Sequence, residues 1–285
     1  MKNEPPMAGT PTDYPATIHG FRVLAKLGDG AASRLFVVSD PETRQILALK
    51  HVRAEAARDR RFLAQAEREH LVGSRVSSSL VRASRRLIRY RELVRTTEIA
   101  LVLDFIDGEP LDRRGPLPLW DQVSIFADVA AGLAHLHDLG WAHADLKPGN
   151  IIRTGPGRGT IIDLGQAARL GETKPRIQGT PGFLAPEQLE RGAIDSRTDA
   201  FLLGATIYKR LTGHYAAAGI SGPMSHKPLR RLVASAPVAL EALVERCLDP
   251  HPGRRPHRLD QVSLELRECA AGLQEMDEAA LPLAV

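Results

Sequence analysis

The hydrophobic pattern of this chain changes its period once, and that change constrains the fold more than any other feature. In the first third, short segments such as Phe21–Leu27 and Ile46–Lys50 alternate or cluster apolar residues between turn residues. In the remainder, apolar residues recur every three or four positions, as in Leu119–Leu139. The first pattern is typical of strands and the second of amphipathic helices. A β-rich part followed by a helical part predicts an α+β protein with two lobes.

The expected elements follow from these patterns. Strands are predicted over Phe21–Leu27, Ser33–Val38, Ile46–Lys50, Leu87–Val94, Ile99–Phe105, 151–152 and 161–162. Helices are predicted over Ala54–Val72, Leu119–Leu139, Ser196–Leu211, Pro237–Leu248 and Leu259–Leu273.

Composition sets the class of protein. With 285 residues, 43% of them hydrophobic and 25% charged, the chain can bury a sizeable core. The net charge of +4 is spread along the chain, so we expect a solvated surface and no nucleic-acid partner. The basic clusters Arg58–Arg61 and Arg82–Arg95 keep nucleic-acid binding as the alternative.

The ends of the chain and its cysteines bear on the expected cellular location of the protein. Residues 1–17 are rich in Pro and lack the apolar core of a signal peptide, so they are predicted to be a disordered leader. No apolar run approaches the ~18 residues that span a bilayer. Only Cys247 and Cys269 are present, without metal-site spacing, which is typical of a reducing compartment. A cytoplasmic protein is expected, with a flexible tail over 274–285.

One loop carries the most specific chemical pattern. Residues 143–150 read His-Ala-Asp-Leu-Lys-Pro-Gly-Asn. The carboxylate of Asp145 can accept a proton, the ammonium of Lys147 can balance negative charge, and the amide oxygen of Asn150 can ligate a metal. An ordinary polar loop after a helix would rarely combine these groups at this spacing.

A glycine-rich turn lies between the first two predicted strands. Two glycines, two residues apart, allow backbone N–H groups to approach phosphate closely, although many such turns only close a hairpin. A strand follows the turn, so it is not a dinucleotide-binding fingerprint. The segment comprises Leu27, Gly28, Asp29, Gly30, Ala31, Ala32, Ser33, Arg34 and Leu35.

A lysine follows in an otherwise apolar strand. Lys50 comes after Ala48 and Leu49, and it either points to solvent or binds phosphates with a helical carboxylate as its partner. The next predicted helix supplies two candidates for that carboxylate. We favour Glu67, and Glu69 stays open as the alternative.

Four further features appear in order toward the C-terminus. Asp163-Leu164-Gly165 follows an apolar strand, where a carboxylate suits a Mg²⁺ ion bound to phosphates. The segment Gly179–Glu187 reads Gly-Thr-Pro-Gly-Phe-Leu-Ala-Pro-Glu, Asp199 lies near the start of an apolar helix, and Arg255 precedes Pro256. None of these four features alone is specific for one family of proteins, but their order along the chain is specific.

Together these motifs resemble those of eukaryotic-type serine/threonine protein kinases, including bacterial ones, over residues 18–273. The resemblance implies a bilobal fold with an N-lobe at 18–103, a hinge at 104–108, a helical C-lobe at 109–273, and ATP in the cleft between the lobes. It also implies transfer of the ATP γ-phosphate to Ser or Thr hydroxyls of protein substrates, by a monomer or weak homodimer.

The resemblance assigns roles to particular residues. Asp145 would be the catalytic base, assisted by Lys147 and Lys50, and Glu187 would pair with Arg255. Asn150 and Asp163 would hold Mg²⁺ or Mn²⁺. ATP would also contact the glycine-rich segment Leu27–Leu35, Ala48, Glu67, Leu103, Asp104 and Ile106.

Ala144 departs from the family pattern. Most relatives have Arg before the catalytic Asp, where it receives a phosphate on the activation segment. Between Gly165 and Ala185 the hydroxyl residues are Thr173 and Thr180, of which Thr180 is expected to be structural. We therefore predict activity that does not need a phosphate at Thr173. Arg169 or Arg176 could replace the missing receiver.

Two rival functions remain at this level. A pseudokinase that binds ATP as a scaffold is favoured by Ala144 and Ser33, but every residue expected to contact ATP and metal is present. A small-molecule kinase shares the loop at 143–150 but generally lacks the Ala-Pro-Glu segment and the later Arg. The physiological substrate and the activating signal do not follow from the sequence.

Overall fold

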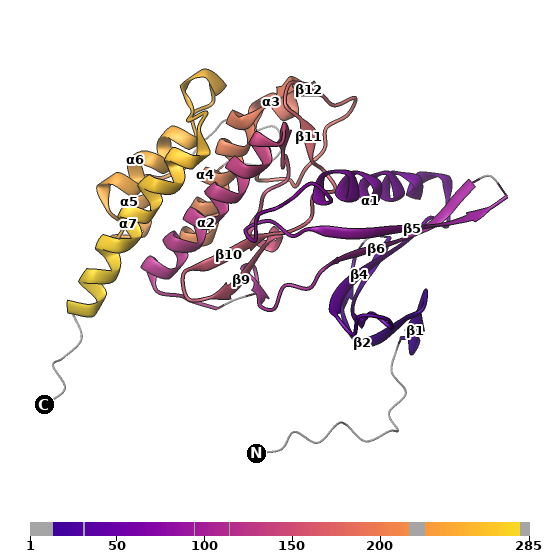
Figure 1. The fold of residues 1–285 in the computed structure, drawn as a ribbon. Coiled ribbons are helices and arrows are strands. Elements are labelled where there is room, and N and C mark those ends of the chain that lie inside the picture. Colours follow the sequence, from indigo (N-terminus) through magenta and orange to yellow (C-terminus); the bar gives the residue numbers. More distant parts are fainter. Residues whose placement is uncertain (1–13, 31, 94, 114, 217–225, 280–285) are drawn as a thin grey trace, which may run out of the picture. The chain divides into compact units, whose positions relative to one another are not determined.

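The computed structural model describes residues 14–30, 32–93, 95–113, 115–216 and 226–279. These residues form two compact units. The first runs to Leu63 and resumes over Leu87–Phe105, and the second comprises Ala64–Arg86 and the described residues from Ile106 on. The first unit is built on a sheet and the second is largely helical (Figure 1). The predicted α+β class with two lobes is confirmed.

The first unit contains one six-stranded antiparallel sheet. Its strand order is β1-β2-β3-β4-β6-β5. The strands are β1 (Thr17–Ile18), β2 (Phe21–Asp29), β3 (Ser33–Ser39), β4 (Ile46–Arg53), β5 (Ser84–Glu92) and β6 (Arg95–Asp104). Asp40 fixes the turn between β3 and β4, because its carboxylate accepts the backbone N–H groups of Glu42 at 2.9 Å and Thr43 at 3.0 Å.

The register of this sheet sorts its residues onto two faces. Lys50 lies opposite Leu35 on β3 and Leu101 on β6, and residues that pair across strands share a face. Lys50 and its neighbour His51 therefore point to opposite sides. On the face of His51, apolar residues gather into a buried core to which β1 and β2 also contribute. Its members are Ile18, Phe21, Val23, Phe36, Val38, Leu47, Leu49, Ala100 and Val102.

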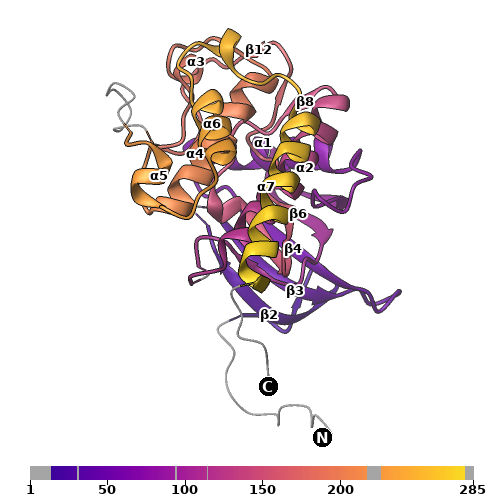
Figure 2. The ribbon, with the colours of Figure 1, turned by 90° about the vertical axis from the view of Figure 1, so that its left-hand side faces the viewer.

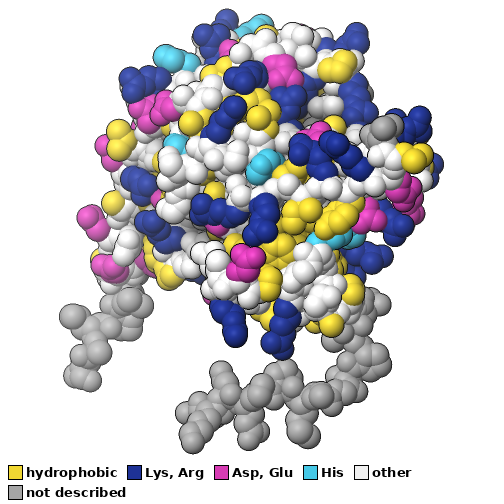
Figure 3. All heavy atoms as spheres, turned by 45° about the vertical axis from the view of Figure 1, so that its right-hand side comes forward, with side chains coloured by type: hydrophobic (Ala, Val, Ile, Leu, Met, Phe, Trp, Pro, Cys, Tyr) yellow, Lys and Arg dark blue, Asp and Glu magenta, His cyan; other side chains and the backbone are white. Residues whose placement is uncertain are grey.

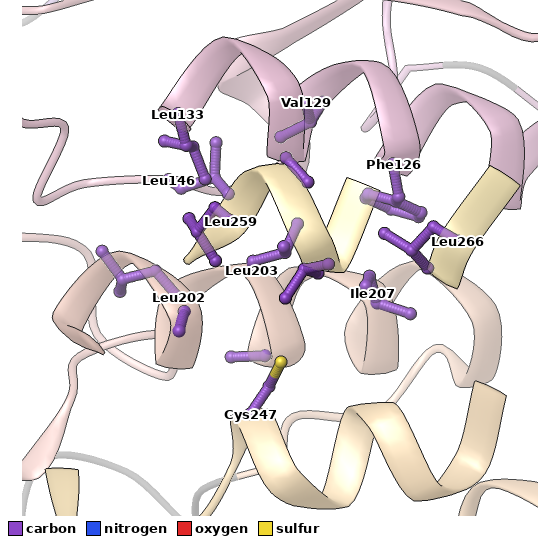
Figure 4. Close-up of a cluster of buried hydrophobic side chains, with 14 of the residues drawn as sticks. Phe126, Val129, Leu133, Leu146, Leu202, Leu203, Ile207, Cys247, Leu259 and Leu266 are labelled. Atoms are coloured by element: carbon purple, nitrogen blue, oxygen red, sulfur yellow. The ribbon is translucent and has the colours of Figure 1, made fainter. Parts of the chain in front are cut away.

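The second unit is organised around four helices that contact one another, with α2 against α7 and α4, and α6 against α4 and α7 (Figure 2). They are α2 (Leu119–Asp138), α4 (Ser196–Thr212), α6 (Val238–Cys247) and α7 (Leu259–Ala279). Their apolar faces meet in one core, in which Phe126 and Leu133 of α2 lie near Leu203 of α4 and Leu266 of α7 (Figure 4). Asp195 caps α4 by accepting the N–H of Arg197 at 2.8 Å, and Gly213 ends it at φ +76°.

Short elements hold the connecting loops of the second unit. They are β7 (Glu109–Pro110), β8 (Trp141–Ala142), β9 (Ile151–Gly155), β10 (Arg158–Ile161), β11 (Ala168–Arg169), β12 (Glu172–Thr173), β13 (Ala193–Ile194), α3 (Pro186–Leu189) and α5 (Leu229–Leu232). β9 pairs with β7 and β10, β8 pairs with β11, and β12 pairs with β13.

Several predicted boundaries were wrong, and three of them change the organisation of the chain. The helix expected from Ala54 begins as a short 3₁₀ turn at Ala57, and α1 spans Arg60–Gly73, because the N–H of Ala54 is bonded to Thr97 of β6 at 2.9 Å. The leader expected over 1–17 is structured from residue 14, and residues 1–13 lie outside the described residues. The tail expected from 274 continues α7 to Ala279, since no helix breaker intervenes; residues 280–285 also lie outside the described residues.

Charge is distributed over the surface. Lys and Arg side chains are scattered over the face drawn in Figure 3, with Asp and Glu side chains among them. Among the described residues, no helix is both long and apolar enough to cross a membrane.

Two glycines in helices of the second unit make a matched test of packing. A Cβ added to Gly204 of α4 would lie 2.7 Å from Cβ of Cys247, whereas one added to Gly272 of α7 meets nothing within 4 Å. We expect Gly204→Ala to lower the free energy of unfolding by about 1–3 kcal/mol through overpacking. Gly272→Ala should raise it by up to about 1 kcal/mol, because Ala favours the helix. Urea unfolding of both variants measures the difference; equal effects would contradict it.

Candidate active site

The loop with the most specific sequence pattern is held at both ends by strands of the second unit. It follows α2 and β8, passes through a 3₁₀ turn at Pro148–Asn150, and enters β9. β10 then returns beside β9 and ends two residues before Asp163. The backbone N–H of Ile162 donates to the carbonyl of Asn150 at 2.9 Å. The segments that carry Asn150 and Asp163 are therefore tied together by the backbone.

Asp199, at the start of α4, fixes the backbone of this loop. Its carboxylate is fully buried and accepts the N–H of His143 at 2.8 Å, the N–H of Ala144 at 2.9 Å and Nε2 of His137 at 2.8 Å. Burial alone would raise the pKa of Asp199, but the hydrogen bond and charge of His137, the charge of His143 and the hydrogen bond from Ala144 together outweigh it and hold the pKa below its ordinary value. The buried carboxylate stays charged and keeps its donors aligned.

Ala144 occupies a strained and apolar place. Its φ of +63° lies in the left-handed region, which costs a non-glycine residue about 1 kcal/mol. This turn directs its N–H to Asp199 and its carbonyl to Nε2 of Gln188 at 2.9 Å. Its methyl group belongs to a buried cluster with Ala142, Ala168 and Ile194. The side chain at position 144 thus makes an apolar contact in the interior.

Asp145, Lys147 and Thr180 form a connected polar group. The Thr180 hydroxyl donates to Oδ1 of Asp145 at 2.8 Å and accepts from Nζ of Lys147 at 2.8 Å. Nζ of Lys147 lies 3.8 Å from Oδ2 of Asp145. This geometry supports the structural role expected for Thr180.

The carboxyl of Asp145 is mostly buried, with 13% of its side chain exposed. Burial raises its pKa above the ordinary value, and the nearby Asp163 adds to this effect. Lys147 and the Thr180 hydroxyl oppose the rise. A carboxylate whose affinity for a proton is increased is better suited to accept one from a hydroxyl.

His143 joins the loop to the segment of Asp163. Its Nδ1 accepts the N–H of Asp145 at 3.2 Å, so its Nε2 carries the proton that is donated to the carbonyl of Ile162 at 3.2 Å. The amide nitrogen of Asn150 donates to the carbonyl of Asp145 at 2.8 Å. The amide oxygen of Asn150 therefore points away from that carbonyl. The Asp163 carboxylate accepts the N–H of Gly165 at 3.2 Å. Amide and carboxylate oxygens are the ligands that Mg²⁺ prefers, so these residues fit such an ion.

The first unit gathers most of the other predicted residues. The register places Ala48 opposite Leu103 and Lys50 opposite Leu35, so all four lie on one face of the sheet. Gly28 pairs with Leu35 and Asp29 with Arg34 at the ends of β2 and β3. The N–H of Gly30 donates to the carbonyl of Ser33 at 2.7 Å, which closes the glycine-rich turn. Leu27 lies in β2 with 40% of its surface exposed, and Ala32 lies in the turn. Asp104 ends β6, and Ile106 belongs to the second unit. Ala31 lies outside the described residues.

The two candidate glutamates of α1 differ in environment. Glu69 is buried and pairs with Arg82 of the same unit at 3.2 Å, whereas Glu67 is exposed. The carboxylate of Glu69 is therefore neutralised within its own unit.

The predicted pair of Glu187 and Arg255 is confirmed. Two nitrogens of the buried guanidinium bind the two carboxylate oxygens at 2.8 and 3.1 Å, and Thr198 donates to the same carboxylate at 2.8 Å. Arg255 also donates to the carbonyl of Asp249 at 2.6 Å. The pair joins α3 to the segment that follows α6.

The segment after Gly165 contains contacts that sequence reasoning missed. Glu172 accepts from the guanidinium of Arg68 at 3.3 Å and from the N–H of Arg169 at 2.8 Å. The guanidinium carbons of Arg68 and Arg169 lie 5.3 and 4.5 Å from a ring centre of Trp141. Thr173 is exposed beside this cluster, and Arg176 is exposed as well. No local pattern marks Glu172, because its partner Arg68 lies 104 residues away in the chain.

Lys174 is a second residue that the sequence did not single out. Its ammonium donates to the carbonyl of Gln166. Burial, with a smaller contribution from Arg68, lowers the pKa of Lys174 to about 8, while Glu172, Asp145 and Asp199 act in the opposite direction. A cation of the segment thus lies in the electrostatic field of the two aspartates that organise the loop.

Comparisons with known proteins agree on one family. The family model described as "protein kinase domain" matches residues 21–263. The serine/threonine-protein kinase PknK of Mycobacterium tuberculosis is 35% identical over 185 residues, which are 60% of this chain and 17% of PknK. The serine/threonine-protein kinase PknL of Mycobacterium bovis is 31% identical over 210 residues, which are 70% of this chain and 51% of PknL. The chain thus spans about half of PknL and a smaller part of PknK.

Solved structures support the fold. Two crystal structures of the PknI kinase domain of Mycobacterium tuberculosis, one of them a double mutant, match with TM-scores of 0.68 and 0.71. They are 21% and 23% identical, and the matches cover 88% and 89% of this chain and 97% of each structure.

The buried ion pair generates a stability prediction. Glu187→Gln leaves the guanidinium of Arg255 buried without its countercharge, so we expect the free energy of unfolding to fall by about 3 kcal/mol. Glu265→Gln is the control, because Glu265 pairs with Arg246 at an exposed site. This change should lower the free energy of unfolding by less than about 1 kcal/mol. Urea unfolding would disprove the argument if both changes cost the same.

Proposed function

Because this chain belongs to the protein kinase domain family, we propose that it transfers the γ-phosphoryl group of ATP to Ser or Thr hydroxyls of protein substrates. The observation that carries the proposal is the group formed by Asp145, Lys147 and Thr180 on a backbone held by Asp199. The names of the relatives PknK and PknL support Ser and Thr as acceptors.

Asp145 is the residue to which we assign the proton of the substrate hydroxyl. Its raised pKa favours proton acceptance, and the Thr180 hydroxyl fixes the direction of one carboxylate oxygen. Lys147 brings positive charge toward the same group, where it would balance the charge that develops on the transferred phosphoryl. Catalysis by this arrangement is positioning and charge stabilisation, with no covalent intermediate on the protein.

ATP and a divalent cation follow from the family. We propose that Asn150 and Asp163 hold Mg²⁺ or Mn²⁺, which would neutralise phosphate charge when bound. For the nucleotide we propose the face of the sheet that carries Lys50, Ala48 and Leu103, together with the glycine-rich turn. Within α1 we propose Glu67 as the partner of Lys50, because Glu69 is neutralised by Arg82.

We also propose that activity does not depend on phosphorylation of the segment after Gly165. In this chain a genetically encoded carboxylate, Glu172, engages Arg68 and the backbone of Arg169, while Ala144 provides an apolar contact. Arg68 belongs to α1 and Glu172 to β12, so this contact joins the segment to the helix without a phosphate. A cytoplasmic location and a monomeric or weakly dimeric state stay predictions.

The assignment of Asp145 can be tested by neutralising it. Asp145→Asn should lower the rate of phosphate transfer from ATP to Ser/Thr protein by at least about 100-fold, because the base is removed while the volume is kept. Asp260→Asn, a neutralisation of an exposed aspartate, should leave the rate unchanged. Phosphate incorporation with Mg²⁺-ATP measures the rate, and circular dichroism checks the fold. An Asp145→Asn protein of wild-type rate would refute the assignment, and phosphate appearing only on small molecules would favour the rival kinase class.

The proposal that activity needs no phosphate on this segment predicts different rates for variants of two neighbouring residues. Thr173→Ala should keep the rate within about twofold, since its hydroxyl is exposed and carries no required phosphate. Glu172→Gln should lower it about five- to tenfold, because the loss of roughly 1 kcal/mol of charge-assisted hydrogen bonding loosens the segment. Initial rates of protein purified without phosphate, as checked by mass spectrometry, make the comparison. A large loss in Thr173→Ala would overturn the proposal.

A further inference from the structure

A cluster of two histidines and one glutamate lies in the first unit, on the sheet face opposite Lys50. His51 is on β4, Glu98 on β6, and His19 in the turn between β1 and β2. One ligand atom from each lies within 4.8 Å of the other two. His51 and Glu98 are only 21% and 23% exposed, and Nε2 of His51 is 2.9 Å from Oε2 of Glu98.

The third member of the cluster, His19, is held in place without a hydrogen bond at its Nε2. His19 has a φ of +51°, and its ring stacks on Tyr90 with ring centres 3.9 Å apart. Its Nε2 is buried and has no hydrogen-bond partner among the described residues. A buried ring nitrogen normally finds a partner. His51 and Glu98 each offer a ligand atom within 4.8 Å of a ring nitrogen of His19, so a cation bound by all three residues could supply a partner.

We propose that His19, His51 and Glu98 bind one borderline divalent cation, of which Zn²⁺ is the representative. Two imidazoles and a carboxylate are a ligand set that Zn²⁺ accepts and Mg²⁺ avoids. Tetrahedral Zn²⁺ places its ligand atoms about 3.4 Å apart. The 2.9 Å between His51 and Glu98 is close to this value, and the ligand atom of His19 lies within 4.8 Å of both. His51 binds as the neutral ring, with its proton on Nδ1.

The surroundings fit such a site. The other carboxylate oxygen of Glu98 lies 3.4 Å from Nε of Arg53, an outer contact that would orient the ligating oxygen. Three protein ligands leave a fourth position for water. The cation would connect the turn after β1 to the central strands β4 and β6, so its role would be to fasten this turn to the sheet. This inference does not depend on the proposed kinase activity.

Zinc titration of the whole chain tests the proposal. Protein stripped with EDTA is titrated with Zn²⁺ by calorimetry in excess Mg²⁺, which occupies oxygen sites such as Asn150 and Asp163. We expect one Zn²⁺ bound per chain and a melting temperature raised by roughly a few degrees. Co²⁺ in place of Zn²⁺ should give the visible absorption of a site with nitrogen ligands.

Variants locate the site. His19→Ala and Glu98→Gln should each weaken Zn²⁺ binding by about tenfold or more, whereas His257→Ala, which removes an exposed histidine of the second unit, should not. Glu98→Gln keeps the shape of the side chain, and its melting in EDTA shows whether it folds. The proposal is overturned if the wild type binds no stoichiometric Zn²⁺, or if both variants bind it as tightly as His257→Ala; the cluster is then an ordinary hydrogen-bonded pair beside a stacked histidine.

Discussion

The buried carboxylate of Asp199 is the constraint on which the candidate active site depends. It accepts two successive backbone N–H groups, from His143 and Ala144, and Nε2 of His137. Hydrogen bonds to a charged group contribute about 1.5–3 kcal/mol each, and leaving such donors without a partner in the interior would be costly. The strained φ of Ala144 is held by this interaction. The same turn sets the direction of Asp145, so an aspartate in α4 controls the geometry of the proposed base without touching a substrate.

The apolar surroundings of Ala144 and the acidic residue Glu172 both bear on how the segment after Gly165 is ordered. A segment that carries the Gly179–Glu187 motif must be ordered for the Thr180 hydroxyl to reach Asp145. A phosphate bound by an arginine can supply that order. Here the charge is supplied by Glu172, which accepts from the guanidinium of Arg68 and from the backbone N–H of Arg169, and both guanidinium groups lie over Trp141. The charged partner of Glu172 is Arg68 of α1, and the loop at Ala144 itself carries only an apolar contact at that position.

The two faces of the sheet in the first unit separate two kinds of chemistry. Alternation along β4 places Ala48 and Lys50 on one side and Leu49 and His51 on the other. The first side carries the residues that we assign to the nucleotide. The second side buries an apolar core, at whose edge the His19, His51 and Glu98 cluster lies. A change on one side therefore need not disturb the other, which allows the proposed cation site to be tested independently of catalysis.

Much of the architecture followed from local patterns, because strand alternation, helical periodicity and turn residues act over a few positions. These patterns located every main strand and helix. The motif order predicted the Glu187–Arg255 pair, which the structure confirms, and it predicted Asp145, Asn150 and Asp163 as site residues, which stays a prediction. Local patterns failed where a distant partner decided the outcome. The bond from Ala54 to Thr97 delayed α1, and residues 104 positions apart formed the Arg68–Glu172 contact. The sequence by itself thus determined the family and the chemical groups of its site. Only the tertiary structure decided which charges are paired and which polar atoms are buried together, because these depend on contacts between segments that the chain order does not encode.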